Sequence, residues 1–211
     1  MRSRANFARP PRIALWLVRL FAPAKEAESI LGDLLEEYSQ LASSSGVAVA
    51  RRWYRQQAVM TIAHLIGSGF RLAPWSTTAI VIGGFFLNRL VSGLPEVAIF
   101  AVLHRYRVFD RHFRAYLFFA TDGIAMGHVI MSLFVGCVVA LAAKGREMVA
   151  TMTLTLVFCA LTAAAVLVWV ATGQSLTPWM LPWYAADWLA IVIGGAIVRT
   201  SRSTTPMPAN V

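Results

Sequence analysis

The sequence MVATMTLTLVFCALTAAAVLVWV occupies residues 148–170 and carries no charge over its 23 positions. A helix needs about 20 predominantly apolar residues to cross the hydrocarbon core of a bilayer. The surrounding residues 116–198 contain only five charges in 83 positions. This composition predicts an integral membrane protein.

Three further apolar segments accompany the first, and together they predict an all-α fold, a helical bundle of about four transmembrane helices. The predicted spans are residues 76–103, 116–143, 148–170 and 180–198, within a transmembrane domain of residues 76–200. The basic stretch HRYRVFDRHFRA at 104–115 is predicted to connect the first two spans, and the charged turn KGRE at 144–147 the next two. Residues 201–211 are predicted to be a disordered tail.

The first apolar segment leaves two topologies open, because it contains Gly93 and Pro95. It is either one tilted span or a re-entrant hairpin broken at Pro95. Both alternatives place 14 Lys/Arg on one side and four on the other, so the positive-inside rule does not separate them. Its 28 residues favour one tilted span. We expect a multi-pass membrane protein with a cytoplasmic N-terminus.

Residues 1–57 form a different kind of region, which holds 14 of the 29 formal charges of the chain. Apolar residues recur at helical spacing over residues 25–42, and helices are also predicted over 12–21 and from residue 47 onward. This pattern predicts a small cytoplasmic helical domain over 1–57 and an interfacial helix or linker over 58–75. Residues 1–24 have some features of a signal peptide, but Arg19 interrupts the apolar run, so we expect no cleavage.

Three blocks of this head carry a family resemblance: PPRIALWLVRLFAP at 10–23, ILGDLLEEYSQ at 30–40 and RRWYRQQ at 51–57. In this order, with the third block leading into the membrane, they resemble the permease prefix domain. That domain is the N-terminal helical module of bacterial ABC-transporter permeases of the MacB/FtsX type. The resemblance covers about the first quarter of the chain and implies a docking or regulatory module.

The resemblance also implies a location in the bacterial cytoplasmic (inner) membrane and a protein partner, either a transporter permease or ATPase or a PadR-like regulator. The chain departs from those permeases in having only short loops between its spans, without a large extracytoplasmic domain. It also contains no GxxxxGK[ST] phosphate-binding loop. The apolar tail is therefore either an orphan membrane anchor or an integral module with its own ligand.

Composition and motifs argue against several other classes. The net charge of +9 is dispersed among positions that flank the spans, which is typical of contact with anionic lipid rather than direct nucleic-acid binding. No GxSxG or HExxH motif occurs, so we predict no catalytic residue, no cofactor and no metal site. Cys137 and Cys159 both lie in apolar runs and are not predicted to form a disulfide.

The head offers charged side chains that could face a partner or lipid. The acidic candidates lie on the polar side of the amphipathic segment 25–42, and the basic candidates flank an aromatic pair that is typical of a membrane interface. These candidates are Asp33, Glu36, Glu37, Arg51, Arg52, Trp53 and Arg55. The basic group is also compatible with simple headgroup contact.

Ionisable groups inside the spans are a second candidate site, because each costs about 2.5–3.5 kcal/mol on insertion scales and so faces protein or water. In an antiparallel hairpin of the first two spans, Glu96 is expected level with Asp122 and Arg89 level with His128. The predicted cluster comprises Asn88, Arg89, Glu96, Asp122 and His128. It is a proton-linked or anionic-ligand site, or a set of polar contacts between helices; alternatively, Asp122 lies near the interface.

Two hypotheses of function follow. The first is a non-enzymatic, membrane-anchored regulatory or docking protein, associated with an ABC-type transporter or a PadR-like regulator. The second is a small transporter or membrane sensor that uses the intramembrane polar cluster. A homo-oligomer is compatible with both.

Overall fold

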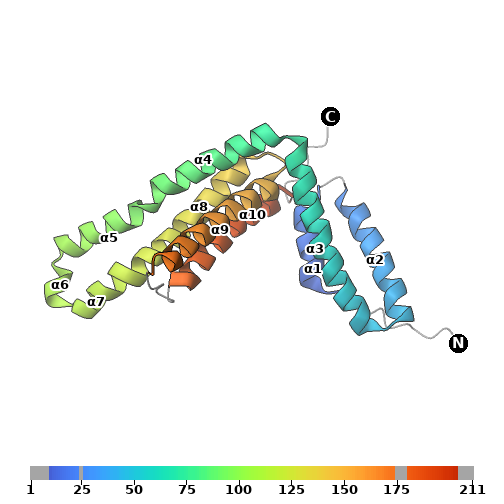
Figure 1. The fold of residues 1–211 in the computed structure, drawn as a ribbon, viewed down its shortest axis with the longest axis horizontal. Coiled ribbons are helices and arrows are strands. Elements are labelled where there is room, and N and C mark those ends of the chain that lie inside the picture. Colours follow the sequence, from blue (N-terminus) through green and yellow to red (C-terminus); the bar gives the residue numbers. More distant parts are fainter. Residues whose placement is uncertain (1–9, 24–25, 174–179, 204–211) are drawn as a thin grey trace. The chain divides into compact units, whose positions relative to one another are not determined.

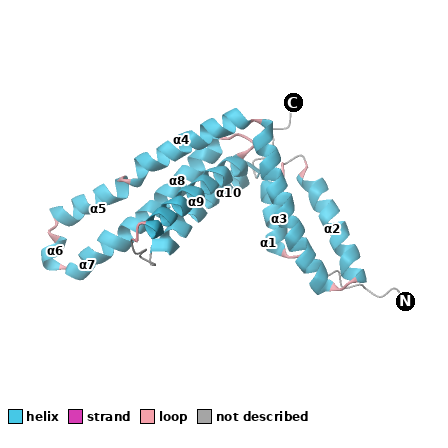
Figure 2. Cartoon of the chain, in the orientation of Figure 1, coloured by secondary structure: helices cyan, strands magenta, loops and turns pink. Residues whose placement is uncertain are grey.

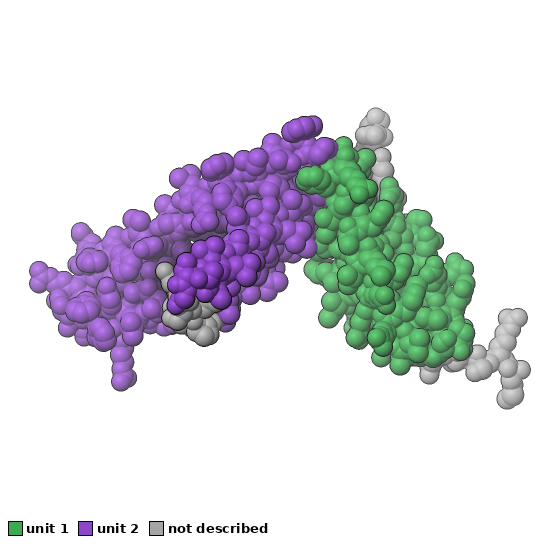
Figure 3. Space-filling view, in the orientation of Figure 1, with its two compact units in different colours: residues 1–73, 203–211 green, residues 74–202 purple. Residues whose placement is uncertain are grey.

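The computed structural model describes residues 10–23, 26–173 and 180–203. Within these ranges every regular element is a helix and no strand occurs, which confirms the predicted all-α fold (Figure 2). The chain divides into two compact units: residues 1–73 with 203–211, and residues 74–202 (Figure 3). Most residues between the third and fourth predicted spans, and most of the predicted tail at 201–211, lie outside the described residues.

The first unit is built from three helices, α1 (Arg12–Phe21), α2 (Ala27–Ser44) and α3 (Val47–Leu72) (Figure 1). Their positions confirm the three helices predicted for the head. The turn between α2 and α3 depends on Gly46, whose φ of 89° lies in the left-handed region that glycine adopts without a steric penalty. The short turn therefore reverses the chain direction, and α3 packs against α2.

A small core holds the head together. It contains Ala14 and Val18 of α1, Leu34 and Tyr38 of α2, and Ala50, Tyr54 and Ala58 of α3. The rings of Tyr38 and Tyr54 meet edge to face with their centroids 5.7 Å apart, a favourable aromatic geometry. Burial raises the pKa of Tyr54 above its ordinary value of 10.0, so its phenol stays protonated at neutral pH.

The predicted division between a head ending at residue 57 and a linker beginning at 58 does not correspond to a boundary in the structure. α3 runs without a break through this point, because the sequence there contains no glycine or proline that would end a helix. Ala58 is 2% exposed in the head core, and Ile62 packs against the same cluster. The head therefore includes the whole of α3.

The second unit contains four helical segments long and apolar enough to cross a membrane: Pro74–Arg105, Phe113–Ala142, Glu147–Ala171 and Leu181–Arg202. They match the four predicted spans. The first comprises α4 (Pro74–Ser92) and α5 (Leu94–Arg105), and the second α7 (Phe113–Phe118), a π-helical turn η1 (Phe119–Gly123) and α8 (Ile124–Ala142). The third and fourth are α9 (Glu147–Ala171) and α10 (Met180–Ser203). The chain is a multi-pass membrane protein.

Large apolar side chains point outward along all four segments. Examples with more than half of their surface exposed are Phe86, Val97, Ile130, Leu167 and Leu189. In water such a surface would be costly, whereas in a bilayer it faces hydrocarbon. The buried core of this unit is small in comparison and consists mainly of Val81, Val135, Val139, Leu154 and Ile191.

The break between α4 and α5 does not reverse the chain. Gly84 of α4 lies against Val139 of α8, and farther along, Ile99 of α5 lies against Gly123. The pairing thus runs in one antiparallel direction past the break, and Figure 1 shows α5 leading onward from α4. The first segment is a broken span rather than the re-entrant hairpin.

Two predicted non-helical regions are partly helical. The connector at 104–115 contains the end of α5, the short helix α6 (Val108–Arg111) and the start of α7. α10 continues to Ser203, three residues into the predicted disordered tail, because Arg202 is held by an ion pair with Glu147. The remainder of that tail is not described.

α8 and α10 approach each other closely through glycines. A Cβ atom at Gly136 would collide with the backbone of Ile191, and one at Gly194 would collide with the backbone of α8 at Leu133 and Cys137. The Cys137 thiol donates a hydrogen bond to the carbonyl of Gly194, with 3.6 Å between sulfur and oxygen. Both Cys137 and Cys159 are free thiols, as the sequence predicts. Small residues permit this packing, which is common between membrane helices.

We predict that Gly136→Ala destabilises the second unit by about 1–3 kcal/mol, because the added methyl group must push α10 away from α8. Thermal unfolding of the full chain in detergent, followed by circular dichroism, measures the effect. Gly83→Ala is the matched control, since a Cβ there meets nothing within 4 Å. Equal melting temperatures for the two variants would contradict the close α8–α10 contact.

Candidate functional site

A pocket of about 380 Å³ lies within the second unit, which is the size of a small-molecule site. Side chains from α4, α8, α9 and α10 line it. The polar ones are Asn88, Arg89, Ser92, His128, Ser132, Thr162, Tyr184 and Asp187, and the large apolar ones include Phe158, Trp169 and Trp188. The pocket therefore combines aromatic walls with several polar groups from different helices.

The pocket extends from Trp169, near the end of α9, to charged groups that lie inside the spans. Arg89 is fifteen residues into the segment that begins at Pro74, about 22 Å along its axis, and Asp187 is seven residues beyond Met180, about 10 Å along α10. At this depth, ionisable groups are costly unless protein, water or a ligand compensates them.

Two buried polar atoms in the pocket wall lack a partner. Asn88 Oδ1 and His128 Nε2 form no hydrogen bond with any described residue. A buried acceptor or donor without a partner costs about 1–3 kcal/mol, so such groups usually have a role beyond packing. They come from α4 and α8, and both line the same pocket.

The two charged residues of the pocket are not paired with each other. The ion pairs found among the described residues involve neither Arg89 nor Asp187. The Arg89 guanidinium lies over the ring of Phe85, 5.4 Å from its centroid, and Asp187 Oδ1 accepts a hydrogen bond of 3.3 Å from the Ser132 hydroxyl. The pocket thus contains an exposed Arg89 and a half-buried Asp187 that form no ion pair, and the His128 ring is close enough to interact electrostatically with Asp187.

The structure brings together three of the five residues of the predicted intramembrane cluster. Asn88, Arg89 and His128 line the pocket, whereas Glu96 and Asp122 do not. Glu96 is exposed on α5, and Asp122 is half-buried in the π-helical turn η1.

The difference arises from the register of the helices. Pro95 lies against Gly127 and Ile99 against Gly123, so Glu96 lies about one helical turn from Asp122 instead of level with it. On the other side of the break at Gly93, Gly84 lies against Val139 with almost the same register, so the offset is present along both segments. The expected pairing of Glu96 with Asp122 is therefore wrong.

Asp187 is the pocket residue that the sequence argument missed. Its signal was present, because it is an acidic residue within the apolar segment 180–198. The sequence predicts a pairing of the first two spans only. The contribution of the fourth helix to the pocket becomes apparent once α8 and α10 are packed together.

The candidate residues of the head lie on the surface of the first unit. Asp33, Glu36 and Glu37 are exposed on α2, and Arg51, Arg52 and Arg55 are exposed on α3. Trp53 is half-buried and packs against the head core, so it also contributes to folding. Among the described residues, the detected ion pairs include none of these charges.

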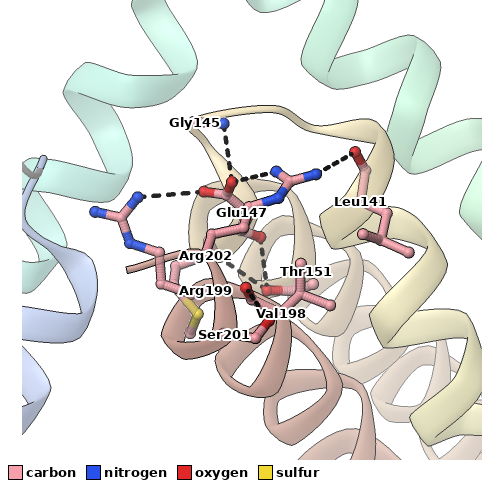
Figure 4. Close-up of polar contacts among 9 residues, drawn as sticks. Leu141, Gly145, Glu147, Thr151, Val198, Arg199, Ser201 and Arg202 are labelled. Carbon is pink, nitrogen blue, oxygen red and sulfur yellow. Dashed lines mark hydrogen bonds and ion pairs between the residues drawn. The ribbon is translucent and has the colours of Figure 1, made fainter. Parts of the chain in front are cut away.

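A second polar cluster joins the turn between α8 and α9 to the end of α10 (Figure 4). The Glu147 side chain is 3% exposed, and its two carboxylate oxygens pair with Arg199 at 3.4 Å and Arg202 at 2.6 Å. The same carboxylate accepts a hydrogen bond from the backbone of Gly145, and Arg202 donates to the carbonyl of Leu141. The charged groups of this cluster are paired with one another, so the cluster holds the end of α10 against the turn between α8 and α9.

The structure contains no group of three or more His, Cys, Asp or Glu within its described ranges that could hold a metal ion. Comparison of the chain with protein-family models, curated proteins and solved structures gives no match. The resemblance of the head to the permease prefix domain therefore stays a prediction from the sequence.

We predict that Glu147→Ala lowers stability by about 1–3 kcal/mol, because Arg199 and Arg202 lose their carboxylate partner while remaining partly buried. The released last turn of α10 should be cut faster by trypsin after Arg199. Glu96→Ala serves as the control, since Glu96 is exposed and takes part in no detected ion pair. Mass spectrometry of digests in detergent measures the cleavage. An unchanged rate of cleavage after Arg199 would contradict the stabilising role of Glu147.

Proposed function

We propose that the protein is a non-enzymatic, membrane-anchored docking or regulatory protein whose helical head binds a protein partner. The observation that carries the proposal is the combination of a head with its own core and charged outer faces that take part in no ion pair among the described residues. A head that served only to anchor the chain would not need these faces.

The acidic face of α2 is the favoured contact surface. Asp33, Glu36 and Glu37 lie together on the exposed side of the helix, opposite the buried Leu34 and Tyr38. Exposed carboxylates steer basic partners and contribute to specificity more than to raw affinity. A partner with a basic groove or helix would complement them.

The partner class comes from the resemblance of the head to the permease prefix domain. On that basis we propose a transporter permease or ATPase, or a PadR-like regulator, as the partner. The head would meet each of these partners on the cytoplasmic side of the membrane. The proposal therefore includes a cytoplasmic head and a location in the bacterial inner membrane.

Charge distribution supports this orientation. One end of the second unit carries Lys144, Arg146, Arg199 and Arg202, and the other carries Arg105, Arg107, Arg111 and Arg114. Because these ends are balanced, the nine Lys/Arg of residues 1–57 decide the excess, and they favour the side on which the chain enters α4.

The test is affinity purification of the tagged full chain from its own membranes after mild crosslinking, followed by mass spectrometry. We expect a permease, an ATPase or a PadR-like regulator, and we expect about tenfold less of it with the triple substitution Asp33→Asn, Glu36→Gln and Glu37→Gln. Arg105→Gln with Arg107→Gln, at the opposite end of the second unit, should leave recovery unchanged. Recovery of the same partner by all three proteins would contradict docking through α2.

A second candidate function is a membrane sensor or small transporter, and the polar pocket favours it. Arg89, Asp187 and the unpartnered atoms of Asn88 and His128 give the membrane unit more polar chemistry than an anchor requires. The two functions are compatible, because a ligand in the pocket and a partner on the head occupy different units of the chain.

A further inference from the structure

The charges of the polar pocket constrain the ligand that it can accept. Arg89 on α4 and Asp187 on α10 both line the pocket, and neither belongs to an ion pair among the described residues. Arg89 is exposed on α4, and Asp187 is half-buried with the His128 ring as its ionisable neighbour. Within a bilayer no water surrounds an exposed side chain, so a charge there is costly without a counterion. A ligand with only one charge would compensate one of these residues and leave the other uncompensated.

The hydrogen-bonding groups of the pocket indicate where each part of such a ligand would lie. Asp187 has one carboxylate oxygen engaged by Ser132, while Asn88 Oδ1 accepts no hydrogen bond from a described residue. Both are acceptors, and an ammonium group carries three donors and no acceptor. Arg89 offers donors in a planar fork that matches a carboxylate or phosphate.

The size and the walls of the pocket limit the rest of the molecule. About 380 Å³ is room for a compact ligand and too little for the acyl chains of a lipid. Phe158, Trp169 and Trp188 supply apolar and aromatic surface beside the polar groups. Aromatic faces also attract a cationic group directly.

We propose that the pocket binds a compact zwitterion, with its acidic group at Arg89 and its ammonium group at Asp187 and Asn88. A free amino acid and the phosphoethanolamine headgroup of a membrane lipid share this chemistry. The inference rests on the second candidate function, since both use the pocket, and it is independent of docking by the head.

The first experiment titrates the purified full chain in detergent and follows tryptophan emission, because two of its seven tryptophans line the pocket. The zwitterionic probes are L-leucine and O-phosphoethanolamine. The single-charge probes are isovalerate and isoamylamine, which each keep one of the charged groups of leucine. We expect saturable binding of at least one zwitterion, about 10- to 100-fold tighter than either single-charge probe.

A second arm identifies the source of the ligand. The chain is placed in nanodiscs of phosphatidylglycerol with or without phosphatidylethanolamine, and leucine is titrated into each. Leucine binding that is unaffected by phosphatidylethanolamine indicates a free amino acid. An emission change caused by phosphatidylethanolamine, together with loss of leucine binding, indicates the lipid headgroup.

Variants separate recognition from folding. Arg89→Gln and Asp187→Asn should each weaken zwitterion binding by about 10- to 100-fold. Arg89→Gln should also abolish the preference for leucine over isoamylamine, and Asp187→Asn the preference over isovalerate. A purely structural role would not exchange these preferences. Glu96→Gln and Asp122→Asn are the controls, because both residues lie in the same membrane unit outside the pocket lining.

Three results would overturn the inference. They are the absence of saturable binding in both detergent and nanodiscs, equal affinity of the wild-type chain for a zwitterion and a single-charge probe, and equal weakening by Glu96→Gln and Asp187→Asn. Partner recovery through the head is measured separately, so loss of pocket binding with retained partner recovery would reject the zwitterion site and leave docking intact.

Discussion

Close packing of α8 against α10, through Gly136 and Gly194, is the contact on which the polar pocket depends. It brings the two backbones together, and one turn away it sets Asp187 within hydrogen-bond distance of Ser132. The hydrophobic effect supplies no net attraction between helices in lipid, so packing and polar contacts must hold them together. A side chain at either glycine would separate the helices and the pocket wall with them.

The membrane unit satisfies its polar groups in two different ways. At one end, Glu147 is bound by two arginines and a backbone amide, so its charge is fully compensated within the protein. In the pocket, Arg89 and Asp187 belong to no ion pair among the described residues, and Asn88 Oδ1 and His128 Nε2 have no hydrogen-bond partner there. The first arrangement stabilises the bundle. The second retains interaction energy that a ligand can recover.

The head is built differently from the membrane unit, with its apolar residues inside and its charges outside. Its core is small, built around the contact of Tyr38 with Tyr54, and its charged residues remain on the outside. Isolated surface charges add little to stability, about 0–1 kcal/mol for each exposed pair. The acidic face of α2 takes part in no ion pair among the described residues, so it is available for the docking that we propose.

The sequence by itself determined the helices, the four spans and the division into a charged head and an apolar tail, because these depend on local composition and periodicity. It also identified Asn88, Arg89 and His128, since an ionisable or polar residue in a span is visible without a structure. Only the tertiary structure decided that Glu96 and Asp122 lie elsewhere and that Asp187 and Glu147 have the partners they do. Those contacts depend on the register and packing of helices that are distant in the sequence, such as α8 and α10 at Gly136 and Gly194, and local composition does not encode them.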